Sequence, residues 1–239
     1  HLGKFAAAIE SYRKAVRRNP LDMNAHRNLN QLLYRTVDDE SFLRSYDEAI
    51  HQFPNIAELR LAKAKFLLLK EDFSSAQTEF EHAVVLAPDA AGPHDGLARV
   101  LAQKGEFESA IRHHETALRI SGQDMNGHIN FADTLLRAGD APRALAVSEA
   151  ALRIMPDHQG ALAYLGSALE LLGDSRATAL NDYDELVQTF EISPPSGYRD
   201  IESFNLDLCE YLDRLHRDKR EVLDQTLRNG TQTLGDLFG

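Results

Sequence analysis

Histidine is the residue type in this sequence with the widest chemical potential, because its ring can bind a metal ion or transfer a proton near neutral pH. The 239 residues include ten histidines and one cysteine, Cys209. His26, His94 and His128 are regularly spaced, with the first interval twice the second, which indicates one position of a repeated unit, packed between helices. We therefore expect these rings to be packing residues that cannot converge on one metal ion.

The other reactive residues form no catalytic or metal-binding motif. Adjacent residues on a helix point about 100° apart, so His113, His114 and Glu115 are not expected to share an ion. The sequence has no cysteine and histidine spacing typical of a zinc site. Cys209 falls in a predicted helix with no candidate base beside it, and we interpret it as a semi-buried small residue. We predict no catalytic residue and no metal ligand in this chain.

The composition disfavours two classes of partner. Lys and Arg number 26 against 37 Asp and Glu, and the resulting net charge of -11 opposes binding to the phosphates of nucleic acid. No apolar run approaches the roughly 20 residues of a membrane-spanning helix. A single cysteine and the absence of a signal peptide favour a cytoplasmic protein. Since the first residue is not Met, we also expect the chain to begin inside a longer protein.

The elements that hold these residues follow a repeat with a period of about 34 residues. Pro20, Pro54 and Pro88 are spaced by one period each, Pro156 lies two periods beyond Pro88, and Gly122 occupies the position between. Alanine recurs at two other positions of the unit, with Phe42 as the exception: Ala15, Ala49, Ala83, Ala117 and Ala151, and Ala8, Ala76, Ala110 and Ala144. A fourth position reads Gly3, Val37, Glu71, Gly105, Gly139 and Gly173.

This register predicts a stack of helical hairpins. Alanine allows two helices to approach closely, and glycine can adopt the left-handed conformation that ends the first helix of each pair. The proline then ends the second helix and begins the turn to the next pair. Aromatic residues at two further positions, among them Phe73, Phe107 and Phe80, are expected in the core.

With these positions at this spacing, the sequence resembles the tetratricopeptide repeat over about residues 1–175. The resemblance implies an all-α, right-handed superhelical solenoid of antiparallel helix pairs. It assigns residues 1–20 to the second half of a truncated repeat, 23–156 to four full repeats, and 157–190 to a partial sixth repeat and a capping helix. The repeat from residue 23 departs most from the pattern, because Asn30 stands where a small residue is expected.

The resemblance also implies a concave groove, lined by the first helices of successive repeats, that commonly binds an extended peptide or a partner helix. Equivalent positions form three rows on this face. The rows are Arg27, Leu61, Asp95 and Ile129; Asn28, Ala62, Gly96 and Asn130; and Gln31, Lys65, Arg99 and Asp133. The candidate partner-binding residues from these rows are Arg27, Asn28, Gln31, Lys65, Arg99, Asn130 and Asp133.

Three interpretations of this groove stay open. Asn28 and Asn130 resemble part of the asparagine ladder of some tetratricopeptide superhelices, since an amide can both donate to and accept from a peptide backbone. The cationic candidates and Gln31 approximate the carboxylate clamp of chaperone-binding tetratricopeptide domains. The third interpretation is a solvated groove whose polar side chains bind no specific partner.

The N-terminal end differs in charge from the rest of the chain. Residues 1–37 carry seven basic and two acidic side chains, a net charge of +5. This end is interpreted either as a docking site for an acidic segment or as a solvated helix face. Self-association through the truncated first repeat is a further alternative, because truncation leaves a helix face without its neighbour.

The repeat pattern ends after Gly173. Residues from Thr178 to Phe190 are predicted to form an amphipathic helix that closes the stack. A break at 193–197, Ser-Pro-Pro-Ser-Gly, separates this helix from a second amphipathic helix over 200–215, with Asp200 as its N-cap. Residues 191–239 are assigned to a linker, this helix and the entry segment of another domain, with a short irregular or β arm at the end.

Residues 182–239 resemble the entry segment of a bacterial family of 2-oxoglutarate- and iron(II)-dependent oxygenases that follows tetratricopeptide repeats in one chain. Such enzymes bind iron through two histidines and a carboxylate, written HxD with a distal histidine. His216-Arg217-Asp218 has these letters, but no histidine follows it. We therefore expect no cofactor in this chain, and Fe(II) and 2-oxoglutarate only in a core beyond residue 239.

The sequence is consistent with two alternative functions. The first is a non-catalytic scaffold for protein interactions, which binds a peptide or protein partner in the concave groove. The alternative is the substrate-recruiting region of an oxygenase whose catalytic core follows this chain.

Overall fold

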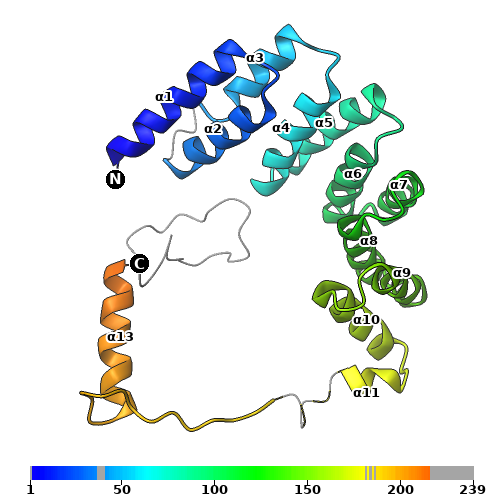
Figure 1. Cartoon of the computed structure of the whole chain (residues 1–239). Helices are drawn as coiled ribbons and strands as arrows, with labels where there is room; N and C mark the ends of the chain where they lie inside the picture. The colour runs from blue at the N-terminus through cyan, green and yellow to red at the C-terminus, as the bar shows by residue number, and fades with distance from the viewer. Residues whose placement is uncertain (1, 37–40, 181, 183–184, 186, 216–239) are drawn as a thin grey trace.

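The computed structural model describes residues 2–36, 41–180, 182, 185 and 187–215 of the 239. These residues form helices and no strand, and the helices follow one another along an arc in Figure 1. The helices are α1 (Leu2–Arg18), α2 (Met23–Arg35), α3 (Arg44–Gln52), α4 (Ala57–Leu69), α5 (Phe73–Leu86), α6 (Ala91–Gln103), α7 (Phe107–Ile120), α8 (Met125–Arg137), α9 (Ala141–Ile154), α10 (Gln159–Leu171), α11 (Arg176–Leu180) and α13 (Ile201–Leu215). The prediction of an all-α solenoid of helix pairs is confirmed.

Most of the repeated alanines are buried between helices. Ala76, Ala110 and Ala144 are fully buried, and so are Ala83 and Ala151. Each pair consists of a first helix of 13 residues and, for α5, α7 and α9, a second helix of 14 residues. Because alanine presents only a methyl group, the helices of successive pairs can stack at a short distance and bury their larger neighbours.

The turn between the two helices of a pair uses left-handed backbone. Gly105 and Gly139 have φ of 79°, and Gly173 has φ of 65°. Glu71 occupies the same position of the repeat with φ of 61°, although a side chain there is disfavoured. The predicted role of this position as the end of the first helix is therefore confirmed at Glu71, Gly105, Gly139 and Gly173. Gly3 instead lies within α1, and Val37 lies outside the described residues.

The second pair departs from the others where Phe42 replaces alanine. The Phe42 ring packs edge-on against Phe66, with ring centres 5.9 Å apart. It is much larger than the alanine that other repeats have at this position. Leu43 takes a left-handed conformation with φ of 64°, and α3 begins only at Arg44, so it has 9 residues. The bulky residue thus shortens the second helix of this pair.

Asn30 compensates for this irregular start. The Asn30 side chain is fully buried, and its amide nitrogen donates to the carbonyl of His26 at 2.8 Å and to Ser45 Oγ at 3.0 Å. Its oxygen accepts from the backbone N–H of Leu43 at 2.6 Å. A polar residue at a position expected to be small therefore caps the beginning of α3 from inside the core.

The predicted capping helix from Thr178 to Phe190 does not reach Phe190. Helix α11 (Arg176–Leu180) covers its start, residue 185 is helical, and residues 187–195 have no regular secondary structure. Val187, Phe190 and Ile192 are 62 to 75% exposed, so the apolar side of the expected helix has no surface against which to be buried. An isolated helix of this length is marginal in water without such packing, and this accounts for the extended segment.

Helix α13 confirms the second predicted amphipathic helix. Asp200 caps it by accepting from the backbone N–H of Ser203 at 2.9 Å. The helix stands apart from the helix pairs in Figure 1, and Leu206, Leu208 and Tyr211 are exposed. Cys209 is exposed as well, so the expectation of a semi-buried residue is wrong. The HxD at 216–218 and the arm that ends the chain lie outside the described residues.

No helix in the described part of the chain has both the length and the apolar character required to cross a bilayer.

Candidate functional site

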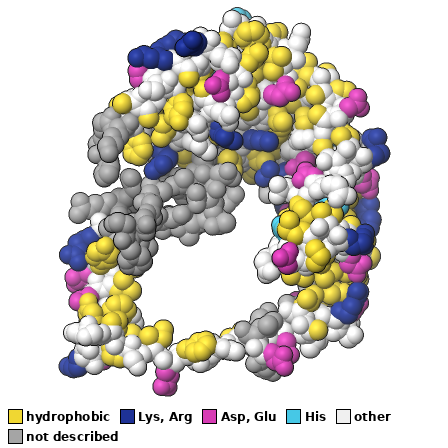
Figure 2. Space-filling view, viewed as in Figure 1, with side chains coloured by type: hydrophobic (Ala, Val, Ile, Leu, Met, Phe, Trp, Pro, Cys, Tyr) yellow, Lys and Arg dark blue, Asp and Glu magenta, His cyan; other side chains and the backbone are white. Residues whose placement is uncertain are grey.

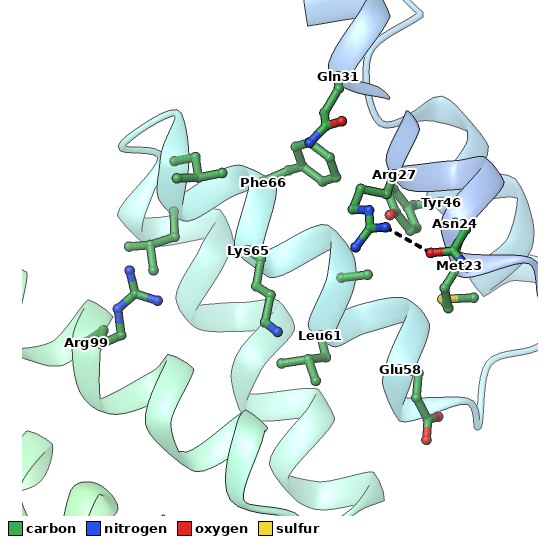
Figure 3. Close-up of a pocket in the computed structure, with 13 residues that line it drawn as sticks. Met23, Asn24, Arg27, Gln31, Tyr46, Glu58, Leu61, Lys65, Phe66 and Arg99 are labelled. Atoms are coloured by element: carbon green, nitrogen blue, oxygen red, sulfur yellow. Dashed lines mark hydrogen bonds between the residues drawn. The ribbon is translucent and has the colours of Figure 1, made fainter. Parts of the chain in front are cut away.

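A pocket of about 460 Å³ opens between the first helices α2, α4 and α6 (Figure 3). Its volume falls within the roughly 300–1,000 Å³ of ligand-binding pockets. The residues that line it are Met23, Asn24, Arg27, Gln31, Tyr46, Glu58, Leu61, Ala62, Lys65, Phe66, Leu68, Leu69 and Arg99. Four of the seven predicted partner-binding residues are among them: Arg27, Gln31, Lys65 and Arg99.

The three cations of the pocket have no acidic partner among the described residues. Arg27 donates to the side-chain oxygen of Asn24 at 2.9 Å, a neutral acceptor. Lys65 and Arg99 make no hydrogen bond or ion pair with another described residue. In Figure 3, Lys65 lies between Arg99 and Arg27, so the positive charges form a row across three helices. The pocket therefore has three side chains that can each donate to an anionic ligand.

The floor of the pocket is apolar. Leu61 and Leu69 are partly buried and pack against the central core, in which Phe66 and Leu68 are buried. Apolar side chains beside unpaired cations suit a ligand that carries both an apolar group and a negative charge. The sequence pattern places Leu61 in a groove row but does not single out Met23, Phe66 or Leu69. Met23 and Leu69 lie one helical turn from Arg27 and Lys65, and Phe66 lies one turn from Ala62 of a groove row, so this spacing could have identified them.

Tyr46 closes one wall of the pocket as a neutral phenol. The residue is fully buried, and its ring stacks on His26 with ring centres 4.7 Å apart. Burial raises the pKa of Tyr46 well above its ordinary value, and the nearby charge of Arg27 only partly opposes this. Tyr46 therefore adds no negative charge to the pocket.

Asn130 and Asp133 lie on α8, outside the pocket, and both have partners within the chain. The Asn130 amide donates to both carboxylate oxygens of Asp95, at 3.2 and 3.0 Å. Asp133 accepts from the hydroxyl of Tyr164 at 3.3 Å and pairs with Arg137 at 3.6 Å. Burial first, and then the charge of Asp133, raise the pKa of Tyr164. A ligand could use these two side chains only by displacing the present partners.

A buried histidine completes the network around Asp95. The Thr134 hydroxyl donates to the carbonyl of Asn130, so the 3.0 Å contact of His114 Nε2 with Thr134 Oγ1 needs the hydrogen on the ring nitrogen. His114 Nδ1 lies 3.4 Å from Asp95 Oδ1 and has no hydrogen-bond partner among the described residues. The network links α6, α7 and α8.

Asn28 is half-buried, does not line the pocket and makes no hydrogen bond with another described residue. The structure thus separates it from Asn130, whose amide is bonded to Asp95. The two residues occupy equivalent positions of different repeats and do not form one site.

The repeat-position histidines are packing residues, as predicted. His26, His94 and His128 are all buried. His26 and His94 donate through Nε2 to the carbonyls of Pro20 and Pro88, each at 3.0 Å, and so tie the first helix to the preceding turn. No group of three or more His, Cys, Asp or Glu side chains suited to a metal ion occurs within the described residues.

Sequence and structure comparisons place this geometry in a known family. The tetratricopeptide repeat family matches residues 2–56 and 129–194, and a second description of the same repeat matches residues 94–125. A comparison with curated proteins gave no match.

Solved structures of similar fold include tetratricopeptide proteins. The structure described as "YrrB: a TPR protein with an unusual peptide-binding site" is 22% identical, with a TM-score of 0.56 over 74% of this chain and 93% of that one. TTC0263, a thermophilic TPR protein of Thermus thermophilus, is 21% identical, with a TM-score of 0.55 over 71% and 92%. BtubC of P. vanneervenii is 17% identical, with a TM-score of 0.62 over 83% and 96%.

These likenesses establish the fold, and the match over more than half of the chain, together with the repeated packing pattern, shows that the protein belongs to the tetratricopeptide repeat family.

Proposed function

We propose that this chain is a protein-interaction scaffold that binds a segment of a partner protein in the groove formed by α2, α4 and α6. The observation that carries the proposal is the pocket of about 460 Å³ with three cations that lack acidic partners among the described residues. Charged groups that find no partner within a folded chain are available to a ligand, and those beside apolar surface lose competing water when the ligand binds.

The fold supports a groove ligand that is a polypeptide. The first helices present equivalent residues at regular intervals along the chain, which suits a ligand that is itself extended and repetitive. Peptide binding is named in the description of the YrrB structure, a protein of similar fold. No step of this function requires a catalytic residue from the described part of the chain.

The test is a change of the groove with a matched change elsewhere. Lys65→Glu with Arg99→Glu reverses two charges in the pocket, and we expect it to abolish capture of partner proteins identified with the unmodified chain. The same change at Arg119 and Arg153, which share one repeat position on α7 and α9, should leave capture intact. Equal recovery of the same partners by both variants would refute the groove as the binding site.

A second candidate function is recruitment of a polypeptide for an oxygenase in the same protein. It is favoured by α13, an amphipathic helix that stands apart from the helix pairs with Leu206, Leu208 and Tyr211 exposed, as expected of a segment that belongs to another unit. Its test is the sequence of the native protein past residue 239. Strands with an HxD, a distal histidine and an arginine would support it, and a stop codon there would refute it.

A further inference from the structure

The pocket between α2, α4 and α6 also indicates the chemistry of its ligand. We propose that it binds an internal segment of a partner protein with two or more side-chain carboxylates beside an apolar residue. This inference rests on the proposed function and specifies its ligand. The occupant is an acidic, partly apolar peptide, held by side-chain carboxylates along a row of cations.

The charges on the inner face favour an acidic occupant. The protein as a whole carries a net charge of -11, yet the pocket has Arg27, Lys65 and Arg99 against a single acid, Glu58. Figure 2 shows Lys and Arg side chains on the inner side of the arc near α2 and α4. A local positive field in an acidic molecule attracts acidic segments and repels the basic ones that would bind elsewhere.

The arrangement of the cations favours several carboxylates over one. Lys65 and Arg99 stand at the same repeat position on neighbouring first helices, and Arg27 comes from a third helix. Figure 3 shows them as a row with Lys65 in the middle and Leu61 beside it. A single terminal carboxylate can contact one or two neighbouring cations, whereas side-chain carboxylates along an extended chain can pair with each member of a row.

The same surface limits where the acidic residues can lie. The cationic repeat position becomes Asp133 on α8, so the row ends at α6. Glu58 lies at the N-terminal end of α4, away from Arg99 in Figure 3. Carboxylates of the ligand are therefore expected over Lys65 and Arg99, with the apolar side chain against Leu61 and Leu69.

The experiment begins with an unbiased ligand search. The full chain is used to select binders from a library of random peptides displayed with both ends blocked by carrier sequence. The affinity of the selected peptide is then measured by fluorescence anisotropy, with a free and with an amidated C-terminus. We expect selected sequences with at least two Asp or Glu beside a Leu, Ile or Phe, equal binding after amidation, and affinity that falls several-fold as salt is raised.

Two matched variants locate the binding. Lys65→Glu with Arg99→Glu should weaken binding at least ten-fold, and the milder Lys65→Ala with Arg99→Ala should weaken it less. Arg119→Glu with Arg153→Glu makes the same change of net charge on second helices and should leave affinity unchanged. All four positions are on helix surfaces, and circular dichroism verifies that each variant keeps its helix content.

The other outcomes overturn the inference in distinguishable ways. Selected peptides without acidic residues, lost in the Lys65 and Arg99 variants, would overturn the acidic ligand but retain the groove as a peptide-binding site. Loss of binding on amidation would show a site for a terminal carboxylate. A library that yields no binder would overturn both this inference and the proposed function.

Discussion

Gly96 on α6 faces the ring of Phe80 on α5 so closely that a Cβ added to the glycine would overlap the ring. Phe80 is fully buried in the central core and cannot move aside without displacing its neighbours. The absence of a side chain at Gly96 thus allows α5 and α6, which belong to successive pairs, to approach each other. The sequence pattern places Gly96 in a groove row, but the residue is buried and faces α5, so it supports the packing of α6 and does not line the pocket.

We expect Gly96→Ala to destabilise the protein by about 1–3 kcal/mol, because the added methyl group overpacks the core. Gly92→Ala is the matched control on the same helix, where the added Cβ would meet only Leu61 Cδ2 at 3.4 Å. That variant should be neutral or more stable, since alanine has the higher helix propensity. Urea denaturation measures both, and equal midpoints for the two variants would contradict the close packing.

Asn30→Ala should destabilise the protein by at least about 2 kcal/mol, because it leaves the buried N–H of Leu43 without an acceptor. It also removes the hydrogen bonds to the His26 carbonyl and Ser45. Asn28→Ala, two residues away and without such partners among the described residues, should change the free energy of unfolding by no more than about 0.5 kcal/mol. Thermal unfolding of the two variants provides the measurement, and similar losses would disprove the capping role of Asn30.

A pair of histidines makes stability depend on pH. His94 donates through Nε2 to Pro88, so its Nδ1 is the acceptor in the 2.9 Å contact with His113 Nδ1. Burial lowers the pKa of His113, and the neighbouring His94, Arg112 and His114 lower it further, while Glu81 opposes them. Burial also lowers the pKa of His26. The rings of His113 and His26 are thus harder to protonate in the folded state than in the unfolded chain.

Because the unfolded chain binds more protons below about pH 6.5, the free energy of unfolding should fall as the pH decreases from 7.5 to 5. Replacement His113→Gln keeps a donor for His94 and removes one of the two shifted groups, so it should make this decrease smaller. Urea midpoints at several pH values test the prediction. An unchanged slope in the variant would show that His113 does not contribute.

Glu79 is the centre of a half-buried ion network that joins α4 and α5. Its oxygens accept from Arg60 at 2.9 Å and from Lys63 at 2.7 Å, and its side chain is 13% exposed. Burial alone would raise the pKa of Glu79, but the hydrogen bonds and charges of Lys63 and Arg60 lower it overall. Glu79→Gln should therefore cost about 2 kcal/mol, since Arg60 loses its countercharge and Lys63 keeps only Asp47, at 2.7 Å.

Glu115 provides the control for this ion network. It pairs with Arg143 at 3.1 Å but is 52% exposed, so Glu115→Gln should cost no more than about 0.5 kcal/mol. A calorimetric comparison in low salt distinguishes the two variants. If the exposed pair proved as costly as the buried network, the assigned importance of burial at Glu79 would be incorrect.

The regular spacing of the repeat was sufficient to predict the helix pairs, because a repeated small residue has only one packing role in a stacked array. It also placed Arg27, Gln31, Lys65 and Arg99 on one face, and these residues line one pocket. The spacing does not reveal which side chains are already bonded. Asp95 accepts from Asn130, 35 residues away in sequence, and this contact depends on the angle between α6 and α8.

The predicted capping helix extends further than the structure shows for a related reason. The spacing of apolar residues from Thr178 to Phe190 would give a helix one apolar face. Such a helix is stable only if that face packs against another element, and the local sequence does not specify one. Leu171 and Leu172, at the end of α10, remain exposed where the second helix of a full pair would lie. Amphipathic pattern alone thus could not distinguish a helix from an extended segment there.

Helices α1 and α2 are held together by a core of their own. Val16, Ala25, Leu29 and Leu33 form a cluster separate from the central one, and Phe42 packs against both. The pocket draws Met23, Asn24, Arg27 and Gln31 from α2 and the remaining first-helix residues from α4 and α6. A ligand in the pocket would contact helices packed on both clusters, so binding should suppress fraying of α1 and α2 and slow hydrogen exchange at amides far from any direct contact.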